Sequence, residues 1–212
     1  MGKSSGYFIY DRNEMLEFVP LSAKKILDVG CGEGVFINQI KKRQEIEAWG
    51  VEINTDIADK AKPVFHKLYN AAIEDVIPQL PKNYFDCIIF NDVLEHTVNP
   101  LLILKLIKEN LKQDACIVSS IPNVRYMPNL YQLLIHKDWK YDEKGGILDD
   151  THLRFFTKKS IIRLFDDAGY QIDILKGINP IELFKYKLLF ALSFGFLDDT
   201  KYLQFASRII KK

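Results

Sequence analysis

The sequence predicts an α/β fold, in which a mostly parallel sheet of seven strands carries helices on both faces. Three observations support this prediction: a glycine-rich turn joins an apolar strand to a helix at 25–34, an acidic residue closes the next strand, and short apolar runs then alternate with amphipathic stretches. Alternating strands and helices are typical of parallel sheets, because helices make the crossovers. The expected fold is therefore Rossmann-like, interrupted by an aromatic-rich lid insertion at 122–156.

Composition and charge indicate an ordinary globular domain. The chain has 212 residues, of which 48% are hydrophobic and 27% charged, and its formal net charge of +1 gives no bulk attraction to nucleic acid. Cys31, Cys87 and Cys116 fall in apolar strands or in the glycine turn, as expected for reduced thiols of a cytoplasmic protein. We expect no signal peptide and no transmembrane segment.

The first strand and its turn read K-I-L-D-V-G-C-G-E-G over 25–34. Dinucleotide sites use the spacing G-x-G-x-x-G, with a phosphate at the helix N-terminus. Here the spacing is G-x-G-x-G, and Asp28 lies in the strand immediately before the turn. A carboxylate repels a pyrophosphate and attracts a cation such as a sulfonium or an α-ammonium group. The run therefore favours a cationic ligand over a dinucleotide.

Further polar groups end the neighbouring strands. Glu52 ends the second strand, about 20 residues beyond the glycine turn, where a carboxylate binds the hydroxyl pair of a ribose. Ile53 follows it and can pack against an adenine face. Asn91 follows the fourth strand, and ligands of open α/β sheets bind at the carboxyl ends of the strands.

These runs resemble the motifs of class I S-adenosylmethionine (SAM)-dependent methyltransferases. The resemblance covers about 24–175, and the motifs V-L-E-H at 93–96 and D-x-T-H-L-R-F-F-T at 149–157 are similar to those of a branch of small bacterial enzymes. It implies SAM as cofactor and S-adenosylhomocysteine (SAH) as product. The implied cofactor-binding residues are Asp28, Gly30, Cys31, Gly32, Gly34, Glu52, Ile53, Ala72, Ile73, Glu74, Asn91 and Val93. Many relatives carry an acid or a polar residue where this chain has Ala72, so adenine contacts would come from main-chain groups or from Glu74.

Methyl transfer to a hydroxyl requires removal of its proton, a task that suits histidine near neutral pH. His96 directly follows Glu95 at the end of the fourth strand, and His152 comes from the insertion. We expect His96 and His152, supported by Glu95, to activate the acceptor. His66 and His136 have no such context, and we expect them to be structural.

A metal-assisted reaction is the alternative use of these residues. If 92–96 forms a helical turn, then Asp92, Glu95 and His96 share one face, and His152 completes the set. The run is similar to the E-x-x-E-H run with which small-RNA 2′-O-methyltransferases hold a divalent metal. Mixed carboxylate and imidazole ligands suit Mg, Mn, Fe or Zn. The primary expectation is nevertheless a site without a metal.

We expect a single domain in four parts: an N-terminal helix at 1–22, a cofactor-binding core at 23–121, the lid at 122–156, and a C-terminal part of the sheet at 157–212. In methyltransferases of this type the N-terminal helix lies across the cofactor mouth, which makes Tyr7, Tyr10 and Arg12 further candidates. An apolar helical stretch near 181–197 is interpreted as core cover, a dimer face or a contact with a lipid-linked substrate.

The predicted function is SAM-dependent O-methylation of a hydroxyl on a sugar, a glycan or a small metabolite. One alternative is a non-catalytic SAM-binding or partner module. The other is a metal-assisted RNA 2′-O-methyltransferase, which the near-neutral charge disfavours. The expected partners are a small-molecule or glycan acceptor and, as an alternative, a second copy of the chain.

Overall fold

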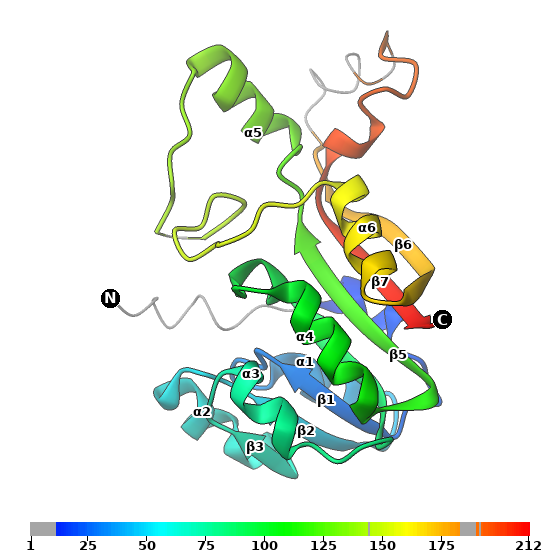
Figure 1. Cartoon of the computed structure of the whole chain (residues 1–212). Coiled ribbons are helices and arrows are strands. Elements are labelled where there is room, and N and C mark those ends of the chain that lie inside the picture. Colours follow the sequence, from blue (N-terminus) through cyan, green and yellow to red (C-terminus); the bar gives the residue numbers. More distant parts are fainter. Residues whose placement is uncertain (1–11, 144, 183–189, 191) are drawn as a thin grey trace.

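The computed structural model describes residues 12–143, 145–182, 190 and 192–212, and its centre is one seven-stranded sheet (Figure 1). The sheet order is β3-β2-β1-β4-β5-β7-β6. The strands are β1 Lys25–Val29, β2 Glu47–Val51, β3 Lys67–Tyr69, β4 Phe85–Asn91, β5 Leu111–Pro122, β6 Tyr170–Pro180 and β7 Tyr202–Lys211. β7 runs antiparallel between β5 and β6, and the other pairings are parallel. The predicted fold class is therefore confirmed.

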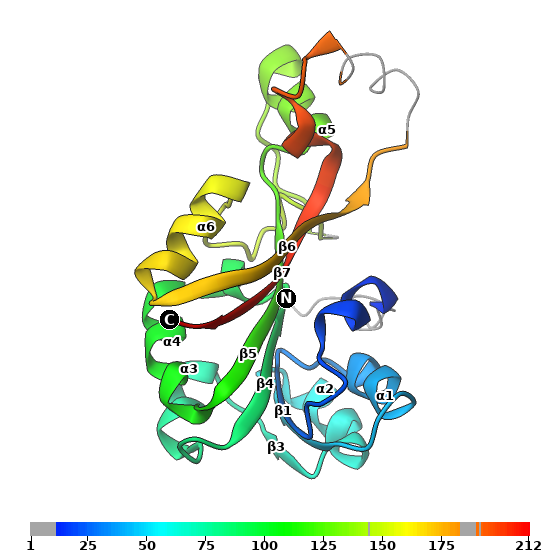
Figure 2. The ribbon, with the colours of Figure 1, turned by 90° about the vertical axis from the view of Figure 1, so that its right-hand side faces the viewer.

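Helices cover both faces of this sheet. The α-helices are α1 Val35–Lys41, α2 Thr55–Ala61, α3 Ile73–Val76, α4 Pro100–Ile107, α5 Met127–Tyr131 and α6 Lys158–Asp167. Short 3₁₀ helices and one π-helical turn (η7) join them: η2 Asn13–Phe18, η3 Lys62–Val64, η4 Ile77–Gln79, η5 Leu94–His96, η6 Lys108–Asn110, η7 Gln132–His136 and η8 Asp198–Lys201. Figure 2 shows α1 and α2 on one side of the sheet, and α3, α4 and α6 on the other.

Two hydrophobic cores lie against the two faces, because successive strand residues point to opposite sides. Leu27 of β1 belongs to the core that contains Phe165 of α6. Its neighbour Ile26 belongs to the other core, together with Ile37 of α1 and Phe18 of η2. The sheet is buried on both faces, as is usual for parallel strands.

Two helix starts follow from their cap residues. Asn54 precedes α2 and accepts a hydrogen bond from the Ile57 main-chain N at 3.2 Å. Thr157 precedes α6 and forms a reciprocal capping box with Ser160. Both caps are predicted from the sequence and satisfy main-chain donors that a first helical turn leaves open.

Several element boundaries differ from the predicted ones. The helix expected to reach about Leu111 ends at Ile107, and Leu111 instead opens β5. The fifth and sixth strands are longer than predicted, because β7 pairs with β5 as far as Pro122 and with β6 as far as Pro180. The N-terminal helix, predicted over 7–18, is described only as η2, and Tyr7 and Tyr10 lie outside the described residues.

The apolar stretch 181–197 is only partly described, because 183–189 and 191 lie outside the described residues. Leu192, Phe194 and Phe196 have exposed fractions of 66%, 97% and 80%, so core cover is wrong for these three side chains. The dimer face and the lipid contact stay predictions. Among the helices in the described part of the chain, none is long and apolar enough to cross a membrane.

Candidate functional site

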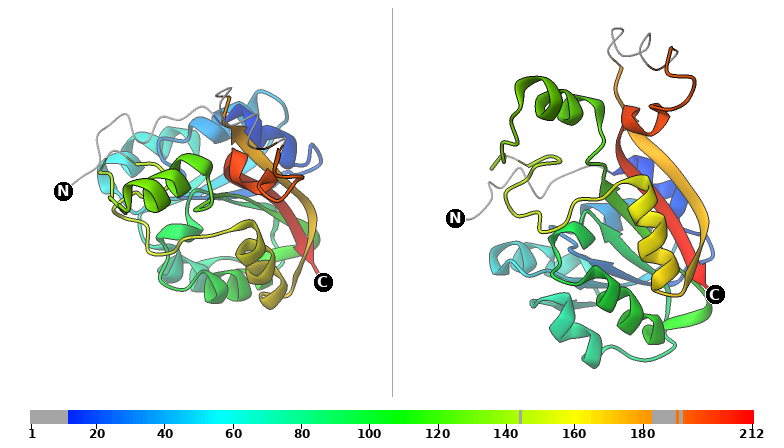
Figure 3. Two further views of the ribbon diagram at one scale, coloured as in Figure 1. Left: turned by 90° about the horizontal axis from the view of Figure 1, so that it is seen from above. Right: turned by 45° about the horizontal axis from the view of Figure 1, so that its top comes forward.

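The carboxyl ends of the parallel strands meet at one edge of the sheet, and the predicted site residues gather there. The strand order places the ends of β3, β2, β1 and β4 side by side. The segment 123–157, which carries α5, extends beyond this edge (Figures 1 and 3). The arrangement brings the glycine turn, Glu52 and 91–96 to one side of the molecule.

The glycine turn lies close under the end of β4. Gly30, Gly32 and Gly34 all have positive φ, at 67°, 53° and 82°. The Gly30 main-chain N donates to the Val51 carbonyl at 2.8 Å. A Cβ at Gly30 would lie 2.6 Å from Cγ2 of Val93, closer than real Cβ contacts allow. Only glycine therefore fits at this position without displacing a neighbour.

Two buried acids flank the turn. Asp28 and Glu52 are 3% and 5% exposed. Burial raises the pKa of Asp28 to about 8, and the charge of Glu52 adds to the increase. Glu52 accepts from the main-chain N of Gly32 at 3.0 Å and of Asn54 at 2.9 Å, so it also holds the turn in shape. A buried acid pair of this kind favours a cationic ligand, and each Glu52 oxygen keeps a lone pair for a hydroxyl.

The remaining cofactor candidates differ in what they offer. Ile53 is 70% exposed and presents an apolar face at the edge. The Ile73 side chain is buried in the core, so a cofactor could contact only its main chain. Both side-chain polar atoms of Asn91 are buried without a hydrogen-bond partner among the described residues. Burial raises the pKa of the Cys31 thiol, which keeps that side chain protonated.

These features fit SAM. The glycine turn leaves room beside the main chain, Asp28 and Glu52 provide negative charge and hydroxyl acceptors, and Asn91 has an unused amide. When SAM is bound, it supplies an electrophilic methyl group on its sulfur.

Glu95, His96 and His152 form a compact cluster beside these residues. One donor atom from each lies within 4.8 Å of the other two. The His152 Nε2 lies 4.0 Å from Oε1 of Glu95, and the two imidazole rings meet edge to face with centroids 4.6 Å apart. The structure thus brings together the three residues predicted to activate the acceptor, from η5 and from the insertion.

Main-chain carbonyls determine the orientation of both imidazoles. His152 Nδ1 lies 2.9 Å from the Ile147 carbonyl, and His96 Nδ1 lies 3.2 Å from the Thr151 carbonyl. A carbonyl only accepts, so each Nδ1 carries the hydrogen and donates it. In the neutral rings, Nε2 of His96 and of His152 is therefore the atom with a free lone pair.

The Glu95 carboxyl is 1% exposed, and neither oxygen has a hydrogen-bond partner among the described residues. Burial raises the pKa of Glu95, and the charge of Asp92 raises it further. Burial lowers the pKa of His96, and the neighbouring His152 contributes. The Glu95 main-chain carbonyl accepts from Leu153 N at 2.9 Å, which ties the insertion to η5.

Asp92 has a different environment from the one predicted. The expectation that it shares a helical face with Glu95 and His96 is wrong, because η5 begins at Leu94 and Asp92 has a left-handed φ of 54°. Its carboxylate binds Arg12 at 2.5 Å and accepts from Ser120 Oγ at 3.0 Å and Gln204 Nε2 at 2.6 Å.

Sequence reasoning missed this network around Asp92. One signal could have indicated it: Gln204 is a polar residue inside an otherwise apolar strand, and buried polar groups need partners. Arg12, a cofactor or substrate candidate in the sequence, instead binds a site-edge carboxylate.

The other two histidines lie apart from this cluster. His66 Nδ1 accepts from the Ala48 main-chain N at 3.1 Å, and His136 packs its ring against Tyr131. Both contacts agree with the predicted structural roles.

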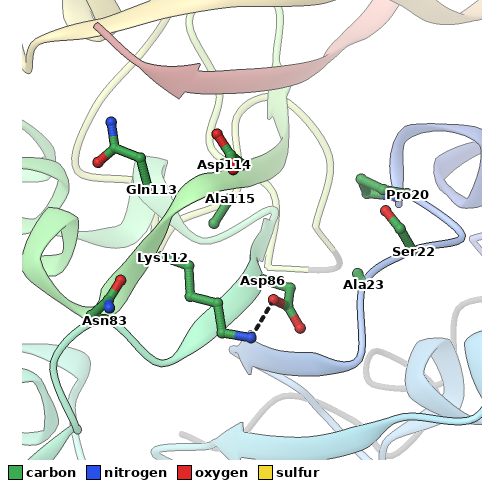
Figure 4. Close-up of a pocket in the computed structure, with 9 residues that line it drawn as sticks. All are labelled: Pro20, Ser22, Ala23, Asn83, Asp86, Lys112, Gln113, Asp114 and Ala115. Atoms are coloured by element: carbon green, nitrogen blue, oxygen red, sulfur yellow. Dashed lines mark hydrogen bonds and ion pairs between the residues drawn. The ribbon is translucent and has the colours of Figure 1, made fainter.

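A polar hollow of about 480 Å³ lies at the opposite end of the strands (Figure 4). It includes Asp86 at the start of β4 and Lys112 at the start of β5, which pair at 2.6 Å. Asp86 also accepts from the main-chain N of Lys24 and Lys25. Ligands of parallel sheets bind at the carboxyl ends instead, and the polar groups of Asp86 are already satisfied within the fold.

Residues 9–174 match a family model described as a methyltransferase domain. The chain belongs to this family. The match covers the glycine turn, the cluster and most of the sheet, and it confirms that the protein is a SAM-dependent methyltransferase, as the sequence motifs predict.

Relatives of this methyltransferase include enzymes named ubiquinone biosynthesis O-methyltransferase. The one from Neisseria meningitidis serogroup A is 24% identical over 171 residues, which are 75% of this chain and 68% of the relative. The one from Actinobacillus pleuropneumoniae is 29% identical over 176 residues, or 76% of this chain and 72% of the relative.

Solved structures share the fold at low sequence identity. A SAM-dependent methyltransferase from Methanosarcina mazei aligns with a TM-score of 0.65 at 16% identity, over 96% of this chain and 99% of that one. One from Archaeoglobus fulgidus has a TM-score of 0.64 at 19% identity, over 91% and 87%. The plantazolicin methyltransferase BamL, solved with SAH, has a TM-score of 0.62 at 18% identity, over 89% and 77%.

Proposed function

We propose that this methyltransferase transfers a methyl group from SAM to a hydroxyl group of a small-molecule acceptor. The observation that carries the proposal is the cluster of Glu95, His96 and His152 at the cofactor edge of the sheet. The names of the relatives support oxygen as the methylated atom and a small metabolite as the acceptor. The sugar and glycan acceptors expected from the sequence have no support among the relatives described above.

In this proposal, Asp28, Glu52 and Asn91 bind SAM together with the main chain of the glycine turn. Asp28 faces the cationic part, because a buried carboxyl with a raised pKa gains most from a countercharge. Glu52 takes the ribose hydroxyls with the lone pairs that its two main-chain contacts leave open.

The cluster then prepares the acceptor. The hydroxyl lies against Nε2 of His152, whose lone pair takes the proton. The oxygen forms a bond to the methyl carbon as the carbon–sulfur bond breaks, and the products are a methyl ether, SAH and a protonated imidazole. The insertion 123–157 covers this edge and limits the access of water.

Substitution of His152 tests the proposal. A panel of phenols, catechols and polyols is assayed for SAM-dependent methylation, and SAH binding is measured by calorimetry. His152→Ala is expected to lower turnover by about 100-fold, the usual contribution of a general base, while SAH affinity stays within about twofold.

His136→Ala is the matched control, because it removes an imidazole outside the cluster. Equal loss of turnover and SAH affinity in His152→Ala would contradict the catalytic role of His152. SAH binding without turnover on any acceptor would favour the non-catalytic alternative.

A further inference from the structure

We infer that Glu95, His96 and His152 together bind one divalent transition-metal ion, such as Zn²⁺, Fe²⁺ or Mn²⁺. The site is inferred from the geometry of these three side chains alone. Its role in methyl transfer rests on the proposed function. The three residues come from two segments, η5 and the insertion, that meet at the cofactor edge of the sheet.

The first argument is that the three side chains present acceptors to one another and no donor. Neither carboxylate oxygen of Glu95 has a hydrogen-bond partner among the described residues, although the residue is 1% exposed. Each imidazole donates through Nδ1 to a main-chain carbonyl and turns its lone pair at Nε2 away from it. Buried acceptors without donors are costly, and a bound cation satisfies all of them at once.

The second argument concerns the contacts that hold the imidazoles. A metal-binding histidine usually donates its other ring N–H to a carbonyl or carboxylate, which determines the orientation of the ring. His152 donates to the Ile147 carbonyl, and His96 to the Thr151 carbonyl. Thr151 is held in turn by Asp149, which accepts from its main-chain N at 2.8 Å and from its hydroxyl at 2.6 Å. The supporting shell of a metal site is thus already built.

The third argument is spacing and chemical type. Ligand atoms at about 2.1 Å from a single ion lie within about 4.2 Å of one another. The three donor atoms here lie within 4.8 Å, so side-chain movements of less than about 1 Å close the site. Two imidazoles and one carboxylate suit first-row transition metals, and three protein ligands leave coordination positions open. Asp92, the fourth member of the sequence-based set, is bound to Arg12 and lies outside this group.

An open coordination position explains how the site would serve methyl transfer. An acceptor hydroxyl bound there has a lowered pKa and releases its proton to water, so that neither imidazole needs to accept it. The oxygen then forms its bond to the methyl carbon as the carbon–sulfur bond breaks. In this form of the proposed function, the histidines act as ligands.

Titration of the metal-stripped, full chain with Co²⁺ tests the site without any acceptor. Co²⁺ held by nitrogen and oxygen ligands gives visible absorption bands that report its binding directly. One equivalent is expected to bind, and His152→Ala and Glu95→Gln are each expected to weaken the affinity at least tenfold. Glu95→Gln keeps the shape of the buried side chain, and His136→Ala serves as the control that retains full affinity.

Two further measurements separate the site from the proposed function. SAH titration of each variant shows that the fold and the cofactor site persist. Absence of Co²⁺ binding to wild-type protein that binds SAH, or binding that both cluster variants retain, would overturn the metal site. Turnover that falls on metal removal and returns with added metal would support its role, whereas full turnover of the stripped enzyme would overturn that role. Failure to methylate any acceptor would count against the proposed function and would leave the Co²⁺ result standing.

Discussion

The two sides of the site are built in different ways. On the cofactor side, Glu52 binds the main chain of Gly32 and Asn54, and the glycine turn bonds to the end of β2. On the acceptor side, side chains bind side chains over long distances in sequence, and Asp92 and Gln204 are 112 residues apart. The cofactor side is therefore a local main-chain structure, whereas the acceptor side exists only once the whole sheet has formed.

The largest effect is expected from Glu52→Ala, which breaks the cofactor side at its centre. The substitution removes two charge-assisted main-chain contacts and the predicted ribose acceptor. SAH affinity, measured by calorimetry, is expected to fall by about 100-fold, or about 2.7 kcal/mol. An affinity within threefold of wild type would show that Glu52 has no role in cofactor binding.

Gly30→Ala and Gly146→Ala compare a turn on the cofactor side with one in the insertion. Both glycines have positive φ, but a Cβ at Gly30 meets Val93 at 2.6 Å, whereas one at Gly146 meets nothing within 4 Å. In urea unfolding, Gly30→Ala is expected to cost about 2–3 kcal/mol and Gly146→Ala about 1 kcal/mol. Equal losses would mean that backbone strain alone determines both effects.

Asp92→Asn addresses the acceptor side. Asparagine tolerates the left-handed φ of 54°, so the substitution removes charge from the Arg12 pair while keeping the backbone. Turnover is expected to fall about tenfold, because a partly buried guanidinium loses its partner. SAH affinity should stay within twofold, and a parallel loss of affinity would show that the two sides are not separable.

The smallest effect is a pH dependence that Asp28 imposes on the cofactor side. Its folded pKa of about 8 lies above the ordinary value of 3.8. The stability it contributes is therefore complete below about pH 4 and is lost as the pH rises to about 8. A cationic ligand favours the ionised carboxyl, so SAH affinity should rise by up to about tenfold between about pH 6 and 8.

Asp28→Asn should remove both trends, because the amide does not titrate. Unfolding free energy and calorimetric affinity at several pH values measure them. A variant that keeps the wild-type pH dependence of SAH affinity would assign that dependence to another group.

The contrast between the two sides also explains what the sequence predicts. Strand, glycine turn and helix follow from local patterns, and so do the caps at Asn54 and Thr157. Glu52 could be assigned because its distance along the chain from the turn is a property of one βαβ unit. The predicted helical face of 92–96 failed, because local spacing does not report the left-handed turn at Asp92.

The contacts around Asp92 could not be predicted, since they join Arg12, Ser120 and Gln204 from separate parts of the chain. The orientation of His152 likewise depends on a carbonyl in an irregular loop, which has no periodic pattern to read. The residue types in the cluster could be identified from the sequence, but the unpartnered state of Glu95 required coordinates.

The position of β7 between β5 and β6 has a consequence for biosynthesis. β6 precedes β7 in the chain but pairs in the sheet only with β7. While the ribosome is still making 181–201, β6 therefore has no strand beside it and β5 presents an open edge. Gln204, which binds Asp92, arrives with β7 itself. A nascent chain can thus complete the glycine turn early in translation, whereas the acceptor side matures only after the final strand has inserted.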